Sequence, residues 1–376
     1  MASNMREESI SMDVEMTSAS PIQPAAPATN YRPWTDFQPV LPGAGQQKSK
    51  ESEASTEKIT PHFVLPRYEW SKARKQKALE EQNRELGDDE DISLDEVSSR
   101  GEAVYVVQQK YGYAAITFAV IQTGVLILMM LQCGIAPLSL NPMLGPYPDA
   151  LSEWGGKNAV NILDDGEWWR LVTPIFLHAG VVHLLGNVAV QVDLCAFFER
   201  EWGTKVWMII YLASAVGSSI LSVIFMPDTI SVGSSGAVMG IFGGKLSEVI
   251  VRRFERNKTK QERIGHKVRQ EQFGAVACAV TVVMLFSFIP FVDWAAHLGG
   301  LVTGFVVGIA CFSLWIQDNT WKWIGVATGA TLSGVLFIGS LVYMYNGSVM
   351  PAQELSDVCG YYKQFYDDYE CNCQLE

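Results

Sequence analysis

The chain divides, by its pattern of hydrophobic and polar positions, into a polar N-terminal part and an apolar remainder. From Tyr113 onward, apolar runs recur at lengths close to the roughly 20 residues that a helix needs to cross a bilayer. We predict seven membrane-spanning helices, with a re-entrant or tilted segment as the alternative for the shorter second and fifth. The seven runs cover residues 114–135, 182–198, 206–225, 233–251, 273–289, 294–315 and 323–345.

The first 110 residues are acidic and polar, and they contain a Pro/Ala-rich stretch. Such a segment buries too little apolar surface to offset the entropy of ordering, so we predict a mostly disordered tail. Short motifs in it, such as "HFVLPRYEW", are expected either to be helical or to bind partners. The N-terminus lacks the apolar core of a secretory signal peptide, and its acidity is unlike a mitochondrial presequence. We expect no nucleic-acid partner for this chain, whose net charge is −12.

Lysine and arginine positions predict the orientation, because positively charged short loops stay in the cytoplasm. The loop after the fourth run, "VRRFERNKTKQERIGHKVRQEQ", is strongly basic, whereas residues 136–167 contain one lysine, Lys157, and no arginine. The fourth helix therefore ends in the cytoplasm. The N-terminal tail is then cytoplasmic, and the acidic tail after the seventh helix is lumenal or extracellular.

The seven cysteines fall into two groups. Three lie in the exported tail, where oxidising conditions favour one disulfide whose pairing cannot be read from the sequence. The other four lie in or beside predicted helices, where we expect buried small apolar side chains. The tail cysteines are Cys359, Cys371 and Cys373, and the helical ones are Cys133, Cys195, Cys278 and Cys311.

Polar side chains inside membrane helices are costly, so each is a candidate functional group. His183 and Asn187 lie four residues apart and share one face of the second helix. His297 opens the sixth helix, and Ser235 opens the fourth from the same side of the membrane. The four side chains are therefore predicted at a similar shallow depth.

Glycines at four-residue intervals suggest that the fourth and sixth helices touch. Close backbone packing is the plain explanation of such stripes. However, Ser235 stands at the start of one stripe and His297 at the start of the other, so packing would bring them together. The stripes consist of Gly236, Gly240 and Gly244, and of Gly300, Gly304 and Gly308.

A serine and a histidine in contact can perform nucleophilic catalysis. A neutral imidazole takes the proton of the hydroxyl, and the oxyanion that forms on attack needs preorganised donors. Backbone N–H groups at the start of the fourth helix, with His183 and Asn187, can supply them. The other histidines, His62, His178 and His266, lack the spacing of a zinc motif, so we expect no metal and no cofactor.

These motifs, in this order, resemble the rhomboid family of intramembrane serine proteases over residues 114–316. The matching segments are Trp169-Arg170, "HAGVVHLLGN", "GSSGA" and "AHLGGLVTG", and "NPMLGPYPDALSEWGGKNA" is similar to eukaryotic secretory-pathway members. The resemblance implies Ser235 as nucleophile, His297 as base, and an oxyanion hole of His183, Asn187 and the Ser235 backbone. The implied supporting residues are Trp169, Arg170, His178, Gly233, Gly236 and Met239.

Three positions qualify the resemblance. Many relatives carry an aromatic residue one turn after the nucleophile, where its ring packs on the catalytic histidine, but this chain has Met239. A thioether orients an imidazole less firmly, which weakens the expected efficiency. Asp293 is interpreted as a hydrated interface residue and not as a third catalytic group, because the family works without one. Arg170 is either a structural residue of the membrane-embedded loop or a snorkelling interface anchor.

The resulting prediction is an all-α, polytopic transmembrane helix bundle acting on single-span membrane proteins within the lipid bilayer. We assign residues 1–110 to the cytoplasmic tail, 111–316 to a six-helix protease core, 317–346 to a seventh helix and 347–376 to the exported tail. A seventh helix after the core resembles the eukaryotic secretase type of the Golgi, plasma membrane or endosomes. The alternatives are a catalytically weak or inactive client-binding relative and a transporter or channel. The sequence shows no inverted-repeat symmetry, which argues against a transporter.

Overall fold

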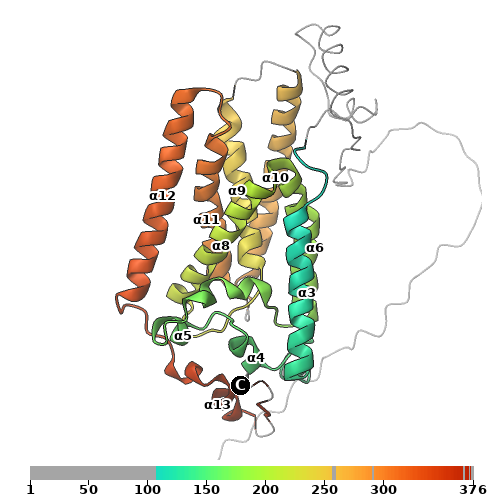
Figure 1. Ribbon diagram of the computed structural model, residues 1–376, viewed down its shortest axis with the longest axis vertical. Coiled ribbons are helices and arrows are strands. Elements are labelled where there is room, and N and C mark those ends of the chain that lie inside the picture. The colour runs from blue at the N-terminus through green and yellow to red at the C-terminus, as the bar shows by residue number, and fades with distance from the viewer. Residues whose placement is uncertain (1–106, 256–259, 290–291, 367–368, 372, 374–376) are drawn as a thin grey trace, which may run out of the picture. The chain divides into compact units, whose positions relative to one another are not determined.

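The structure is a computed structural model that describes residues 107–255, 260–289, 292–366, 369–371 and 373 (Figure 1). The disordered tail predicted for residues 1–110 lies, apart from its last four residues, outside the described residues.

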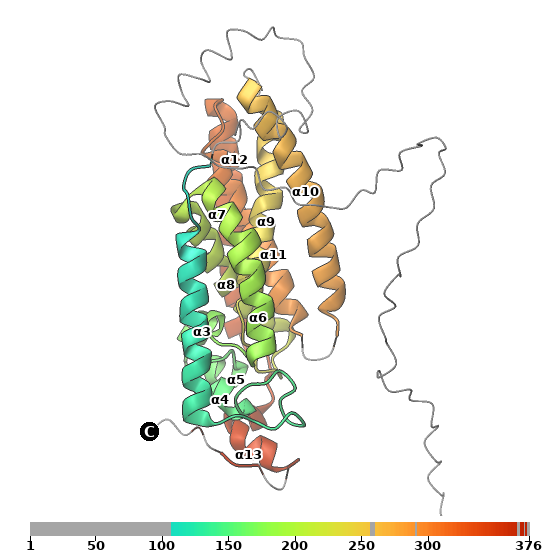
Figure 2. The ribbon, with the colours of Figure 1, turned by 90° about the vertical axis from the view of Figure 1, so that its right-hand side faces the viewer.

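The described part of the chain is helical, with a single isolated β-bridge between Lys157 and Ser231. This confirms the predicted all-α, polytopic bundle. Its long helices run side by side in both views, while the short helices of the first loop and of the C-terminal tail gather at one end (Figures 1 and 2). The long helices are α3 (Tyr113–Cys133), α6 (Val181–Val190) continued by η3 (Gln191–Cys195) and α7 (Ala196–Trp202), α8 (Thr204–Phe225), α9 (Ser235–Val251), α10 (Lys260–Phe286), α11 (Trp294–Ser313) and α12 (Asn319–Tyr345).

Five segments of the described chain are long and apolar enough to cross a membrane. Two of the seven predicted spans fall short of this. Helix α9 has only 17 residues, and α10 begins with the charged sequence KQERIGHKVRQEQ. Both nevertheless run alongside the other helices in Figures 1 and 2. The five segments are Tyr113–Cys133, Val181–Trp202, Thr204–Phe225, Trp294–Ser313 and Asn319–Tyr345.

The two runs that were short in sequence are long helices in the structure. The second reaches Trp202 because a π-helical turn, η3, joins α6 to α7 without a break. The fifth helix starts at Lys260. Its first half is polar, so the apolar run in the sequence marked only its second half. Both are continuous helices, and of the two only the second is long and apolar enough to cross a membrane.

Helices α9 and α11 meet backbone to backbone, which confirms the pairing that the glycine stripes predicted. A Cβ atom on Gly300 would lie 1.8 Å from the Gly236 carbonyl oxygen, and one on Gly304 would lie 1.9 Å from that of Gly240. Only glycine permits these approaches. The contact fixes the first turn of α11 against the first turn of α9.

The loop between α3 and α6 carries helices α4 (Pro148–Glu153), α5 (Ala159–Leu163), η1 (Trp168–Leu171) and η2 (Thr173–Phe176). Lys157 in this loop is buried and bonds the segment before α9. Its backbone pairs with Ser231, and its ammonium donates to the carbonyl oxygens of Met226 and Thr229. The loop therefore holds the chain that leads into Ser235.

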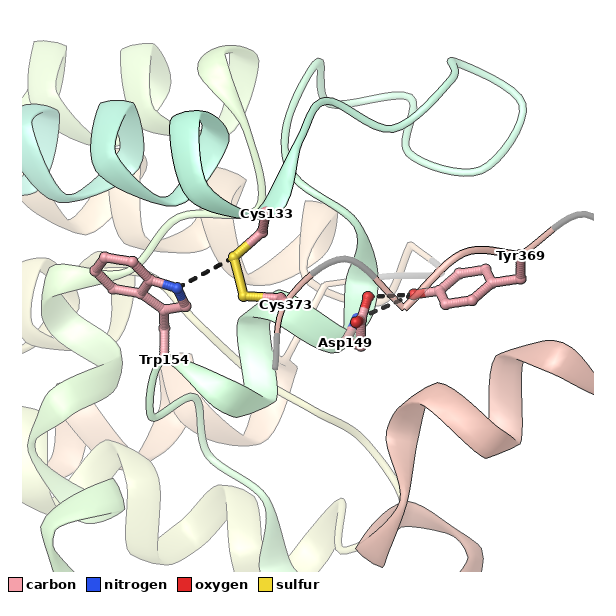
Figure 3. Close-up of a disulfide and its surroundings, with 5 residues drawn as sticks. All are labelled: Cys133, Asp149, Trp154, Tyr369 and Cys373. Carbon is pink, nitrogen blue, oxygen red and sulfur yellow. Dashed lines mark hydrogen bonds between the residues drawn. A yellow bond between two sulfur atoms is a disulfide. The ribbon is translucent and has the colours of Figure 1, made fainter. Parts of the chain in front are cut away.

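The C-terminal tail folds onto this loop. It contains η5 (Gln353–Ser356) and α13 (Val358–Lys363), and the Tyr369 hydroxyl donates to the Asp149 carboxylate (Figure 3). Two disulfides tie the tail, Cys359–Cys371 within it and Cys133–Cys373 to the end of α3.

Two cysteine predictions were wrong. Cys133, expected as a buried apolar side chain, is disulfide-bonded, because the tail returns to the end of α3 in a way that no local pattern reveals. Cys278 is exposed on α10, a helix at the edge of the bundle in Figure 2 that also exposes Leu285 and Phe286. Cys195 is buried, as expected, and Cys311 is partly buried.

Candidate active site

Ser235 is the first residue of α9, and a glycine with a positive φ angle lies two residues before it. Gly233 has a φ of +122°, a conformation that side chains rarely adopt. A Cβ atom there would also lie 2.8 Å from Cε1 of His183. Its N–H donates to the Pro174 carbonyl, so the backbone before Ser235 is fixed by the preceding loop.

Ser235 and His297 are in hydrogen-bond contact. The Nε2 atom of His297 lies 2.8 Å from the Oγ atom of Ser235. His297 occupies the first turn of α11, and its side chain is buried. The structure therefore brings together the two groups that the sequence predicted as nucleophile and base.

Asp293 does not contact the imidazole in the way that a triad carboxylate would. Its Oδ1 atom accepts from the backbone N–H of Ala296, which makes it the N-cap of α11. Its Oδ2 atom accepts from the Ser222 hydroxyl on α8. Asp293 thus positions the helix that carries His297. It is half-buried and bonded within the protein, and so differs from the hydrated interface residue that we expected.

The second ring nitrogen of His297 contacts a residue that the sequence did not suggest. Its Nδ1 atom lies 2.6 Å from Oγ of Ser287, at the end of α10. A polar residue between Phe286 and Phe288 in an apolar run was a signal of the same kind as the others. The signal is weak, because a serine in a helix commonly bonds only its own backbone.

His183 and Asn187 stand on α6 beside Gly233. The backbone N–H of Ala179 donates to Nδ1 of His183 at 3.3 Å, so in the neutral ring the proton is on Nε2. This nitrogen would lie 3.0 Å from a Cβ atom on Gly233, so it faces the segment before the serine. The Asn187 amide nitrogen donates to the His183 carbonyl and lies 3.9 Å from the same Cβ position, with a second hydrogen left to donate.

His178 is fully buried, and its ring stacks edge-on against that of His183 with centroids 5.2 Å apart. Within the described chain, neither ring nitrogen has a hydrogen-bond partner. Burial, with a smaller contribution from His183, lowers the pKa of His178 to about 3. His178 is therefore neutral near pH 7 and supports the position of His183.

The Trp169-Arg170 pair lies on η1. Arg170 is buried, donates to the carbonyl oxygens of Ser152 and Gly156, and forms an ion pair with Glu167. These contacts favour the structural interpretation over a snorkelling anchor. Trp169 is exposed on the same short helix.

The remaining expected residues lie on α9. Gly236 faces α8 and α11, where a Cβ atom would lie 2.0 Å from the Ser218 hydroxyl. Met239 is buried in the core cluster that also contains Trp207 and Tyr211. In the described residues, no group of three or more His, Cys, Asp or Glu side chains is arranged to hold a metal ion.

Residues 165–314 match the rhomboid domain. The chain is 34% identical to RHOMBOID-like protein 4 of Arabidopsis thaliana over 221 residues, which cover 56% of this chain and 52% of the relative. It is 35% identical to RHOMBOID-like protein 6, mitochondrial, of the same plant over 46% of this chain and 53% of the relative. Rhomboid-like protease 2 of Toxoplasma gondii is 28% identical over 50% of this chain and 61% of the relative.

The chain thus spans roughly half the length of the curated relatives that it matches. The match covers the helices that carry the Ser235–His297 contact and the side chains beside it. The chain is a multi-pass membrane protein that contains a rhomboid domain.

Proposed function

We propose that this protein is an intramembrane serine endopeptidase that uses Ser235 and His297 as a catalytic dyad. The observation that carries the proposal is the 2.8 Å contact between the Ser235 hydroxyl and Nε2 of His297 at the start of two helices in backbone contact. The rhomboid domain, whose family has serine intramembrane proteolysis as its general activity, supports it. We place the catalytic unit in residues 111–316, with residues 317–346 and 347–376 as an added helix and a tail.

The chemistry is an acyl transfer in two stages. Nε2 of His297 takes the proton of the Ser235 hydroxyl as Oγ attacks the scissile carbonyl carbon. The backbone N–H of Ser235, Nε2–H of His183 and the Asn187 amide are donors for the oxyanion. Collapse of the intermediate breaks the C–N bond, and the imidazolium gives its proton to the leaving amine. Water, activated by the same imidazole, then hydrolyses the acyl-enzyme.

The substrates are proposed to be single-span membrane proteins cut in or near their membrane helix. An amide inside a helix is hydrogen-bonded and sterically covered, so the segment must unwind before attack. Helix-weakening residues beyond the cut and small residues at the cut therefore favour cleavage. Cytoplasmic partners of the N-terminal tail are a separate expectation from its sequence.

We propose a secretory-pathway location, in the Golgi, plasma membrane or endosomes, with a cytoplasmic N-terminus and a lumenal or extracellular C-terminus. The Cys359–Cys371 and Cys133–Cys373 disulfides support this orientation, because disulfides persist in oxidising compartments. A glycosylation acceptor engineered near Gln364 should receive sugar, and the natural acceptor at Asn257 should not. Sugar on Asn257 would invert the topology.

Reconstitution with a reporter single-span substrate tests the activity. Ser235→Ala and His297→Ala should each abolish cleavage while the protein stays folded. Because the two residues act as a unit, the double variant should be no worse than either single one. Wild-type-like turnover by either variant contradicts the dyad. Wild-type protein that binds the substrate without cutting it indicates a client-binding relative instead.

A further inference from the structure

Ser287 is turned into the protein where its neighbours face outward. It follows the last residue of α10, and only 1% of its surface is exposed, whereas Phe286 and Phe288 are 62% and 67% exposed. Its Oγ atom lies 2.6 Å from Nδ1 of His297 and also 2.6 Å from the carbonyl oxygen of Val283. The hydroxyl is thus held between the imidazole and the backbone of its own helix.

The positions of the protons follow from these two distances. A carbonyl oxygen can only accept, and two oxygens 2.6 Å apart without a hydrogen between them repel each other. The single proton of Ser287 is therefore on the bond to Val283. Its lone pair then accepts from the imidazole, which places the ring hydrogen of neutral His297 on Nδ1.

The tautomer fixed in this way is the one that a general base requires. With hydrogen on Nδ1, the lone pair of Nε2 points at the Ser235 hydroxyl and can take its proton. The opposite tautomer would direct an N–H at Ser235, so it could not act as the base. It would also make one hydrogen bond fewer along the chain from Ser235 to the Val283 carbonyl.

We infer that Ser287 is a positioning residue that sets the tautomer and orientation of His297; the inference rests on the proposed catalytic role of the dyad. It occupies the place that a carboxylate has in a Ser-His-Asp triad. A neutral hydroxyl does this without the cost of burying a charge. Ser287 also helps to orient the imidazole of His297. Many relatives carry an aromatic ring for this purpose, where this chain has the less firmly orienting Met239.

The hydrogen-bonded chain at the site joins residues of three helices. Ser287 belongs to α10, His297 to α11 and Ser235 to α9. The base is therefore in its competent state only when the end of α10 is seated against α11. Hydrogen bonds joined in a chain strengthen one another, so loss of the Ser287 contact weakens the dyad contact as well.

The test compares Ser287→Ala, Ser287→Thr and Ser247→Ala. Ser247 is the matched control, because it is also buried and donates to a carbonyl of its own helix, but it lies 12 residues, or about 18 Å, along α9 from Ser235. Ser287→Ala leaves Nδ1 without an acceptor, so kcat should fall by about 10- to 100-fold with KM changed less than about twofold. Ser287→Thr keeps the hydroxyl and should recover most of the rate.

A second readout does not depend on turnover. In 15N-histidine protein reconstituted in bilayers, the 15N shifts of His297 should show hydrogen on Nδ1, and Ser287→Ala should produce the Nε2–H form. A His297→Gln sample identifies the signals. The inference is overturned if Ser287→Ala keeps the wild-type kcat and tautomer, if threonine does not rescue, or if Ser247→Ala slows the reaction equally. Inactive wild-type protein with the expected tautomer contradicts the proposed function and not the role of Ser287.

Discussion

Replacing Gly300 by alanine should separate the two helices that carry the dyad. The added Cβ atom would lie 1.8 Å from the Gly236 carbonyl oxygen, so it must move by about 1.6 Å to reach the 3.4 Å of an ordinary contact. The neighbouring atoms are backbone, which cannot rotate away. If α9 and α11 spread by this amount, the 2.8 Å contact of Ser235 and His297 lengthens to about 4.4 Å, beyond a hydrogen bond.

The energetic cost can be bounded. Overpacking typically costs about 1–3 kcal/mol, and alanine in a helix returns about 0.5–1 kcal/mol relative to glycine. Since this clash is with backbone, we expect a net loss of about 2 kcal/mol in the free energy of unfolding. Gly339→Ala on α12 is the matched control, because its Cβ atom would meet nothing within 4 Å, and it should be neutral or slightly stabilising.

Two assays check this prediction. Thermal unfolding in detergent should rank Gly339→Ala at or above the wild type and Gly300→Ala clearly below it. Cleavage of the reporter substrate at a temperature where Gly300→Ala is still folded should be reduced by about 100-fold, because a displacement of about 1 Å can cost that much. Wild-type melting and wild-type cleavage by Gly300→Ala would refute the backbone contact as the device that aligns the dyad.

Three further perturbations test other parts of the structure. Cys133→Ala opens a cross-link between residues 240 apart in sequence and should cost about 2–4 kcal/mol in detergent unfolding, whereas Cys278→Ala, at a free cysteine, should cost much less. His178 has a pKa of about 3 when folded and about 6.5 when unfolded, so the unfolded state binds more protons between these values and stability falls on acidification. At pH 5 the loss is roughly 2 kcal/mol, and His178→Phe should show a flatter profile from pH 7 to 5. Lys245 is buried and pairs with Glu201 and Glu248 at 2.7 and 2.8 Å. Lys245→Met removes this cation from both carboxylates, although Glu248 keeps its ion pair with Arg252, and should cost about 3–5 kcal/mol; an unchanged melting temperature would contradict the buried ion pairs.

The helices and the contact between Ser235 and His297 could largely be predicted from the sequence, because both depend on local patterns. Apolar runs located the spans, and glycines at four-residue intervals identified which two helices touch. Packing of those two helices brings the polar groups at their starts close together. Ser235 and His297 lie in contact, and His183 and Asn187 lie beside the segment before the serine, for this reason.

Contacts between distant segments could not be predicted. Nothing near Cys133 in sequence indicates that a tail 240 residues later returns to it. In the sequence Lys157 is an isolated cation in a loop predicted to be exported, yet it is buried and donates to carbonyl oxygens before α9. Ser287 has an ordinary local role, a bond to its own helix, and its second contact exists only because α10 ends beside His297.

Mass spectrometry after treatment with a fluorophosphonate shows whether Ser235 is an activated nucleophile. The reagent reacts with a serine whose proton has been withdrawn by a neighbouring base, so we expect one adduct on Ser235 of the folded protein in bilayers. His297→Ala should remove the adduct without unfolding the protein. Folded wild-type protein that stays unlabelled, or labelling of Ser235 that persists without His297, would contradict the account.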